Sequence, residues 1–248
     1  MVTELSNSPD LANKPIDQER PGSPPRDAFG DLVRARNRDD ATHQLRRSGL
    51  AAAVVPGADG VAAFDGARLV VWAWGAIDLA WADEAAAALD RWPAAQAVIV
   101  RINSHGGQHL AAEFVHKRLR QHRGRTIAVV DHACHSAATI VAAGCDLTWM
   151  RKGASWMCHR VKLAVDGDSG ELSRAAFDAR EIDAQVARKI AGRRGLAFEI
   201  VRDLRDSARF VPAEEAVQLG LADRVIHALP IAGESVPVRE TARQHDDR

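Results

Sequence analysis

The sequence has no tyrosine, and only 5% of its residues are aromatic. Its formal net charge is zero, because 33 lysines and arginines balance 33 aspartates and glutamates. Nucleic-acid-binding proteins carry an excess of basic residues, so we expect no nucleic-acid partner. No apolar run approaches the roughly 20 residues that cross a bilayer, and the start MVTELSNSPDLANKP lacks the basic and apolar parts of a signal peptide. We therefore expect a cytoplasmic protein with no membrane contact.

Cysteine is also scarce, with only Cys134, Cys145 and Cys158. The number is odd, and the spacing is not that of a zinc ribbon or a disulfide scaffold, so we expect three reduced thiols. Cys134 and Cys158 lie close in sequence to the candidate catalytic residues described below. A thiol nucleophile is therefore an alternative that the structure has to address.

A chain of 248 residues with 46% hydrophobic content can bury one sizeable core. Residues 1–30 are rich in proline and polar side chains, which predicts a disordered arm. An Arg-rich stretch over 31–50 permits a helical extension. We expect the folded domain over residues 51–230 and a disordered, polar tail over 231–248.

Within that domain, short apolar runs bounded by glycine or proline alternate with helical patterns, which predicts an α/β fold with a mainly parallel sheet wrapped by helices. The expected strands are AAAVVP, RLVVWAWGAI, AVIVRI, TIAVVDHA, DLTWM and a short one at Val225. The expected helices cover residues 82–92, 110–122, 136–144, 172–191 and 213–219. Two apolar stripes are expected to be buried, Leu110/Phe114/Val115/Leu119 and Phe177/Ile182/Val186/Ile190. In such folds, functional residues collect at the carboxyl ends of the strands.

Two of these strand ends carry residues suited to acyl transfer. The segment INSHGG ends in Gly106 and Gly107, whose backbone amides can approach a substrate carbonyl because no Cβ intervenes. Ser136, in ACHSAAT, opens a small-residue helix whose free amides and positive dipole end would face the hydroxyl. Each feature also has an ordinary explanation, as a turn that selects glycine and as an N-cap serine.

Three segments in order resemble one known family. INSHGG is similar to the INSPGG segment of the Clp protease proteolytic subunit. SAATIVAAGCD is similar to the nucleophile helix of Clp-like and phage prohead-type peptidases, and AEEAVQLGLAD completes the set. They span roughly residues 70–226. The resemblance implies the spiral of ββα units that Clp subunits share with crotonases.

The resemblance also implies a set of site residues. Ser136 would be the nucleophile and His159, after the next strand, the general base. The amide of the first glycine, Gly106, beside Gly107, would form the oxyanion hole with the amide of Ala137. His132 and His135 remain rivals to His159.

The acid of the triad is the least regular assignment. The family's aspartate lies two residues before an aromatic residue, and that position is Ala208 here. Asp206 fits if the loop is shifted by two residues, and Asp203 is the alternative.

Two further positions depart from the family pattern. His105 replaces a proline, which frees the loop backbone that proline would restrict. His135 stands directly before Ser136, where the family has a small residue. If the sequence is aligned to the Clp subunit without gaps up to Gly144, His135 falls at the position of the catalytic serine. If it is aligned to phage-type relatives up to Asp146, Ser136 falls at that position.

The sequence thus predicts a Clp-like serine endopeptidase that forms an acyl-enzyme on Ser136, with no metal or organic cofactor. The resemblance implies peptide or protein substrates and a homo-oligomeric ring of six or seven subunits, single or stacked. An ATP-driven unfoldase partner is left open, because family members that dock one use aromatic-rich pockets. A catalytically silent scaffold subunit is the main alternative. A crotonase-type acyl-CoA enzyme is a weaker one, because no matching glutamate occurs over residues 139–150.

Overall fold

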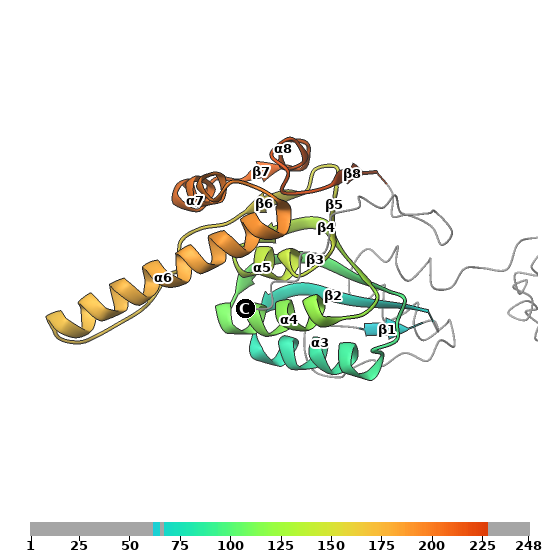
Figure 1. Ribbon diagram of the computed structural model, residues 1–248, viewed down its shortest axis with the longest axis horizontal. Coiled ribbons are helices and arrows are strands. Elements are labelled where there is room, and N and C mark those ends of the chain that lie inside the picture. Colours follow the sequence, from blue (N-terminus) through green and yellow to red (C-terminus); the bar gives the residue numbers. More distant parts are fainter. Residues whose placement is uncertain (1–61, 65–66, 228–248) are drawn as a thin grey trace, which may run out of the picture.

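The computed structural model describes residues 62–64 and 67–227 (Figure 1). The arm expected over residues 1–30, the helical extension over 31–50, the strand AAAVVP and the tail over 231–248 lie outside the described residues. The described part contains all three segments that carry the family resemblance. It therefore tests the expected α/β core.

The centre of the fold is a mainly parallel sheet in the order β1-β2-β3-β4-β5-β8. Neighbours from β2 to β8 are parallel, β6 pairs in parallel with β4, and β1–β2 and β6–β7 are antiparallel. The expected α/β fold with a mainly parallel sheet is confirmed. The strands are β1 Ala62–Phe64, β2 Arg68–Ile77, β3 Ala97–Gly107, β4 Arg125–His135, β5 Leu147–Arg151, β6 Ser155–Met157, β7 Val211–Pro212 and β8 Arg224–Ile226.

The long central strands are buried on both faces, as parallel strands usually are. Residues 126–130 of β4 are all buried, and so are residues 69–73 of β2. These runs are rich in valine and isoleucine, whose branched side chains suit a pleated surface. β3 is longer than expected, because the segment NSHGG continues the strand to Gly107 instead of forming a loop after it.

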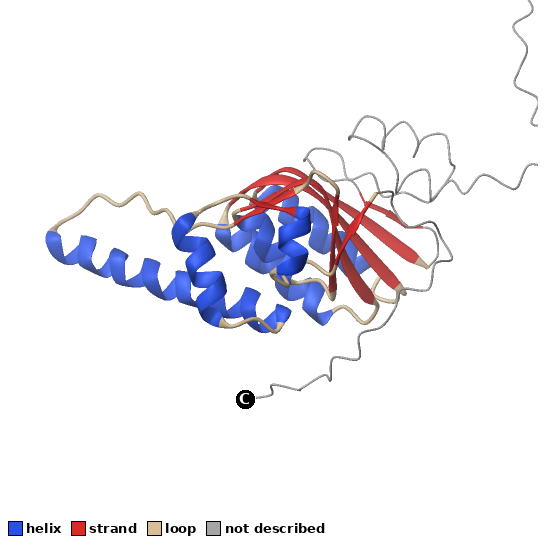
Figure 2. Cartoon of the chain, turned by 90° about the horizontal axis from the view of Figure 1, so that it is seen from above, coloured by secondary structure: helices blue, strands red, loops and turns tan. Residues whose placement is uncertain are grey.

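Helices α3, α4 and α5 lie together against the sheet, and Figure 2 shows them beneath the strands. They follow β2, β3 and β4 in turn, and this repeated order of strand and helix is what the sequence predicted. The helices are α3 Leu79–Arg91, α4 His109–Gln121, α5 Ala137–Ala143, α6 Ser169–Arg194, α7 Phe198–Ser207 and α8 Ala213–Gln218.

The stripe expected on α4 is partly wrong. Leu110 is 75% exposed and Phe114 is 39% exposed, whereas Val115 and Leu119 are buried as expected. The buried face of α4 instead follows the helical spacing of Ala111, Ala112, Val115, His116 and Leu119. Leu110 and Phe114 each stand one residue before a buried position, about 100° around the helix, and they line a surface groove. α5 packs closely on the buried face, because a Cβ added to Gly144 would lie 3.0 Å from the Cα of His116.

Helix α6 begins at a capping box, in which the Asp168 side chain accepts bonds from Gly170 and Glu171 and the Glu171 side chain bonds back to Asp168. Its second half is buried at Val186 and Ile190. Its first half projects away from the sheet (Figures 1 and 2). Phe177, expected on the buried stripe, is 62% exposed there.

The stretch that holds Asp203 and Asp206, expected as a loop, forms helix α7. It is a ten-residue helix with Val201, Leu204 and Arg205 buried. Both candidate acids are therefore on a helix, which fixes the direction in which their side chains point.

Candidate active site

Ser136 stands at the sharp turn between β4 and α5. Its backbone has φ 51° and ψ −122°, and Ala208 is the one other non-glycine residue with positive φ in the described part of the chain. An ordinary N-cap residue has extended dihedrals and a side chain bonded to the helix amides, but the Ser136 side chain makes no cap hydrogen bond. Strained backbone of this kind costs about 1–3 kcal/mol and is typical of functional sites.

Gly106 lies directly against this serine. A Cβ built on Gly106 would be 2.6 Å from the Ser136 Cβ and 2.9 Å from the Ala137 nitrogen. Gly106 also has φ 101°, a conformation that side-chain-bearing residues rarely adopt. The strand end that carries INSHGG and the start of α5 are therefore in contact, as an oxyanion hole at Ser136 requires.

The candidate oxyanion donors differ in their present bonds. The Gly106 amide donates to the Ser104 hydroxyl at 3.0 Å, and that hydroxyl donates to the Gly75 carbonyl at 2.5 Å. The Ala137 amide is in the first turn of α5, where amides have no intrahelical acceptor. Gly107 packs against the end of β2, since a Cβ there would meet the Ile77 carbonyl oxygen at 2.3 Å.

The end of β6, two residues before His159, lies beside Ser136. His135 pairs with Met157, and the Ser136 amide donates to the Met157 carbonyl at 2.7 Å. His159 follows Met157 by two residues. Its Nδ1 lies 2.5 Å from the Arg160 carbonyl oxygen. Within residues 67–227, the Ser136 hydroxyl and His159 share no hydrogen bond.

The two candidate acids are bonded to arginines. Asp206 accepts from Arg160 Nε at 2.6 Å, and this bond lowers the pKa of the carboxyl group. Asp203 accepts from Arg202 at 3.0 Å and is 68% exposed. The Asp206 carboxylate is thus hydrogen-bonded to Arg160, the residue after His159, and not to the His159 imidazole.

The rival base His135 points to a different partner. It is 5% exposed, its Nε2 lies 2.8 Å from the Ser155 hydroxyl, and its Nδ1 lies 3.1 Å from Nδ1 of His105. Phe210 packs edge-on against its ring at 5.0 Å. Burial lowers the pKa of His135, and the neighbouring His105 and His132 lower it further.

Ser155 and Phe210 were not singled out from the sequence. The sequence signal for them was indirect. Ser155 and Phe210 contact His135, which contacts His105, and these two histidines are the positions that depart from the family pattern. His132 is exposed.

The three cysteines are buried and unpaired. Burial raises the pKa of Cys158 to about 11 and raises the pKa values of Cys134 and Cys145 as well. A thiol that stays protonated at neutral pH is a poor nucleophile. The environment of Cys134 and Cys158 therefore disfavours the thiol alternative.

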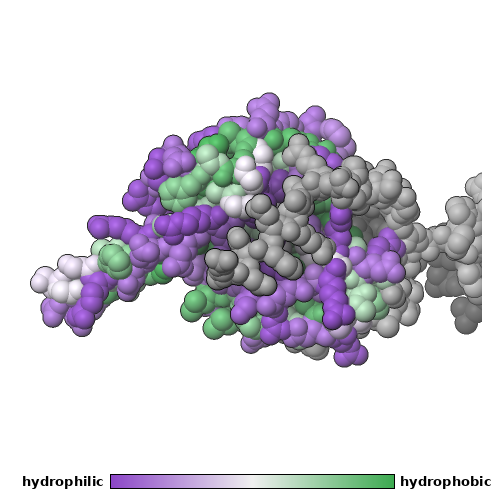
Figure 3. Space-filling model, viewed as in Figure 1, coloured by the Kyte–Doolittle hydropathy of each residue, from purple (hydrophilic) through white to green (hydrophobic). Residues whose placement is uncertain are grey.

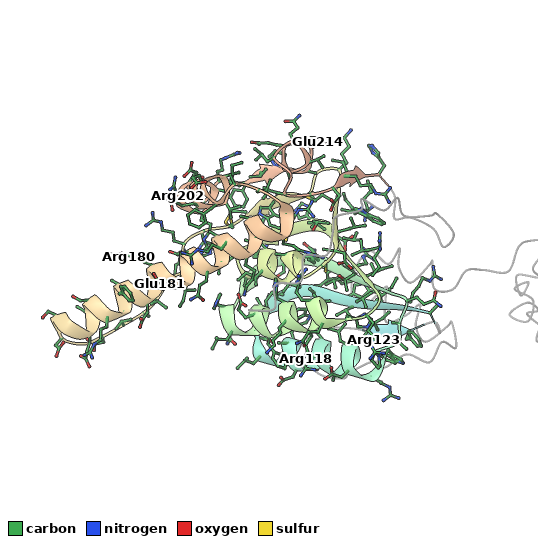
Figure 4. All side chains as sticks on the ribbon, in the orientation of Figure 1. Arg118, Arg123, Arg180, Glu181, Arg202 and Glu214 are labelled. Carbon is green, nitrogen blue, oxygen red and sulfur yellow. The ribbon has the colours of Figure 1, made fainter. Side chains whose placement is uncertain are left out.

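Two surface grooves lie apart from this site. One, of about 470 Å³, runs between α3 and α4 beside Phe114, Arg118 and Arg123, and the other adjoins it on α4. In Figure 4, Arg118 and Arg123 lie at the α3–α4 side of the molecule, far from Arg202 on α7. The helices that the structure describes are too short or too polar to act as membrane spans.

Comparison with known proteins gives the family and the fold. The family model described as Clp protease matches residues 76–228. The fold is similar to that of a ClpP1 mutant from Listeria monocytogenes, with a TM-score of 0.57 and 19% identity, over 63% of this chain and 90% of that chain. The chain therefore belongs to the Clp protease family, and its fold is that of the Clp proteolytic subunit.

Proposed function

We propose that this protein is a Clp-like serine endopeptidase that cleaves peptide bonds through an acyl-enzyme on Ser136. The observation that carries the proposal is the contact between Gly106 and Ser136 at a turn where the serine has positive φ and its hydroxyl is not used as a cap. A strained turn of this kind presents a nucleophile beside backbone donors, which is the arrangement that acyl transfer uses.

In the proposed reaction, His159 takes the proton of the Ser136 hydroxyl as that oxygen attacks the peptide carbonyl. The amides of Ala137 and Gly106 stabilise the resulting oxyanion, each donor contributing about 3 kcal/mol. Gly106 has to exchange its bond to Ser104 for one to the substrate. His159 then returns the proton to the leaving amine, and water hydrolyses the acyl-enzyme.

Asp206 is the proposed orienting acid. Its bond to Arg160 holds it one residue from His159, so a rotation of the carboxylate away from the guanidinium would be needed to reach the imidazole. A triad without its acid loses much of its rate but retains its nucleophile.

The same bond favours a second candidate function, a catalytically silent scaffold subunit. In that case the Asp206 carboxylate remains hydrogen-bonded to Arg160, and Nδ1 of His159 remains at the Arg160 carbonyl oxygen. The protein would then contribute structure to a ring that contains an active paralogue.

Membership of the family supports a homo-oligomeric ring of six or seven subunits that encloses the sites. We propose that the projecting half of α6 makes contacts between subunits, since oligomerisation would bury its exposed Leu172 and Phe177. In Figure 3 that projection is mainly hydrophilic with an apolar patch along it. Dependence on an ATP-driven unfoldase stays open.

The test is labelling of the purified full chain with a fluorophosphonate probe. We expect one modified residue, Ser136, and no labelling of Ser136→Ala. Labelling lost in Cys134→Ala or Cys158→Ala would move the nucleophile to a thiol, and no labelling of the wild type would favour the silent subunit. Turnover of an acyl-CoA substrate would favour a crotonase-type enzyme instead.

A further inference from the structure

The ends of β3 and β4 bring two imidazoles together. Nδ1 of His105 and Nδ1 of His135 are 3.1 Å apart, their ring centroids are 5.2 Å apart and the ring planes meet at 48°. His105 directly precedes Gly106, and His135 directly precedes Ser136. The pair therefore joins the two strand ends that form the candidate active site.

The separation of the two nitrogens suits a shared metal ion. Two Zn–N bonds of about 2.0–2.1 Å span 3.1 Å when the N–Zn–N angle is about 95–102°, close to the tetrahedral value. We propose that His105 and His135 bind a divalent late transition-metal ion such as Zn²⁺ through their Nδ1 atoms. The ion ties the ends of β3 and β4 together.

Ser155 supplies the outer support that such a ligand needs. A metal-binding histidine usually gives its second ring nitrogen to a hydrogen-bond partner, which fixes the tautomer and the ring orientation. Nε2 of His135 lies 2.8 Å from the Ser155 hydroxyl. Donation of Nε2–H to Ser155 leaves the lone pair of Nδ1 directed at His105.

The two imidazoles of the pair differ in their surroundings. His135 is nearly fully buried, and Phe210 packs edge-on against its ring, which holds this imidazole in place. His105 is exposed, which gives an ion access from solvent. One ligand is thus held by packing, and the other lies at the surface.

The ion is held by two protein nitrogens, with water in the remaining positions. Among residues 62–64 and 67–227, no group of three or more histidine, cysteine or acidic side chains could hold a metal. Two imidazoles without a carboxylate favour Zn²⁺, Cu²⁺, Ni²⁺ or Co²⁺ over Mg²⁺ or Ca²⁺. We therefore expect reversible binding that exchanges with the medium.

Isothermal titration of ZnCl₂ into the full chain, without a polyhistidine tag, tests the site. We expect one ion per chain, and loss of binding in His105→Pro, which restores the family's residue. Ser155→Ala should weaken binding about tenfold or more. His122→Gln, a histidine on the far end of α4 whose ring contacts the Trp92 carbonyl, should bind as the wild type does.

Two further measurements make the outcome decisive. Zn²⁺ should raise the melting temperature of the wild type, since a ligand that binds only the folded state stabilises it, and should leave His105→Pro unchanged. If His105→Pro does not fold, His105→Asn replaces it in both assays. No binding by the wild type at millimolar Zn²⁺, or equal binding by the His105 variants, would overturn the proposal. Neither readout depends on peptidase activity.

Discussion

Replacing Gly106 with alanine tests the contact on which the candidate site depends. The added Cβ would meet Ser136 Cβ at 2.6 Å, the His135 carbonyl oxygen at 2.8 Å and the Ala137 nitrogen at 2.9 Å. Two of these atoms belong to the backbone and cannot rotate away. The substitution therefore forces the end of β3 away from the start of α5.

Two costs add in this variant. Holding alanine at φ 101° costs about 1–2 kcal/mol in backbone strain, and the overlap with Ser136 costs about 1–3 kcal/mol more. The free energy of unfolding should fall by about 2–5 kcal/mol. For a protein of this size, each kcal/mol lowers the melting temperature by about 2–4 °C.

Gly153→Ala is the matched control. Gly153 also has positive φ, 83°, but a Cβ there would meet nothing within 4 Å. It should therefore show the strain cost without the overlap. Both variants are compared with the wild type by thermal and urea unfolding at one protein concentration, since oligomers unfold with concentration-dependent midpoints. Equal destabilisation of Gly106→Ala and Gly153→Ala would show that Ser136 is not packed against Gly106.

Three other substitutions test separate parts of the account. Gly192→Ala, inside α6 with open space at its Cβ, should stabilise the protein by about 0.5–1 kcal/mol in urea unfolding, because alanine loses less backbone entropy than glycine. Burial lowers the pKa of His116 below 6.5, so the unfolded state binds more protons and the free energy of unfolding should fall as the pH drops below 6.5. The unfolding free energy of His116→Gln should depend less on pH over that range. An unchanged pH dependence would show that His116 does not titrate with a lowered pKa. Asp206→Asn should slow fluorophosphonate labelling by about 10⁴-fold, while Asp203→Asn labels at the wild-type rate. The reverse order would make Asp203 the acid.

The fold could be predicted from the sequence because its signals are local. Runs such as TIAVVDHA are apolar and β-branched over their whole length, which is typical of a strand buried on both faces. The glycines and the following helical patterns then gave the order of elements. The three resembling segments gave the family, and the match over residues 76–228 confirms it.

The helix faces were harder to predict because they depend on the neighbouring helix. α4 buries Ala111, Ala112 and His116 and exposes Leu110, because α5 packs against the side of α4 that carries His116, whose Nδ1 lies 2.9 Å from the Ile140 carbonyl oxygen. The spacing of Phe198, Val201 and Leu204 is helical, and it could have identified α7, but the charged residues between them favoured a loop.

The contacts of the site were beyond sequence reasoning. Nothing local requires Asp206 to bond Arg160 or His135 to bond Ser155, because both contacts join segments that only the folded sheet brings together. The positive φ of Ser136 likewise results from its position between β4 and α5. These are the features that now decide which experiments are informative.

The most direct test of the central claim is the location of the fluorophosphonate adduct by peptide mass spectrometry. We expect a single adduct on Ser136, formed by the wild type and much more slowly by His159→Gln. An adduct on another residue, or a rate that His159→Gln leaves unchanged, would contradict it.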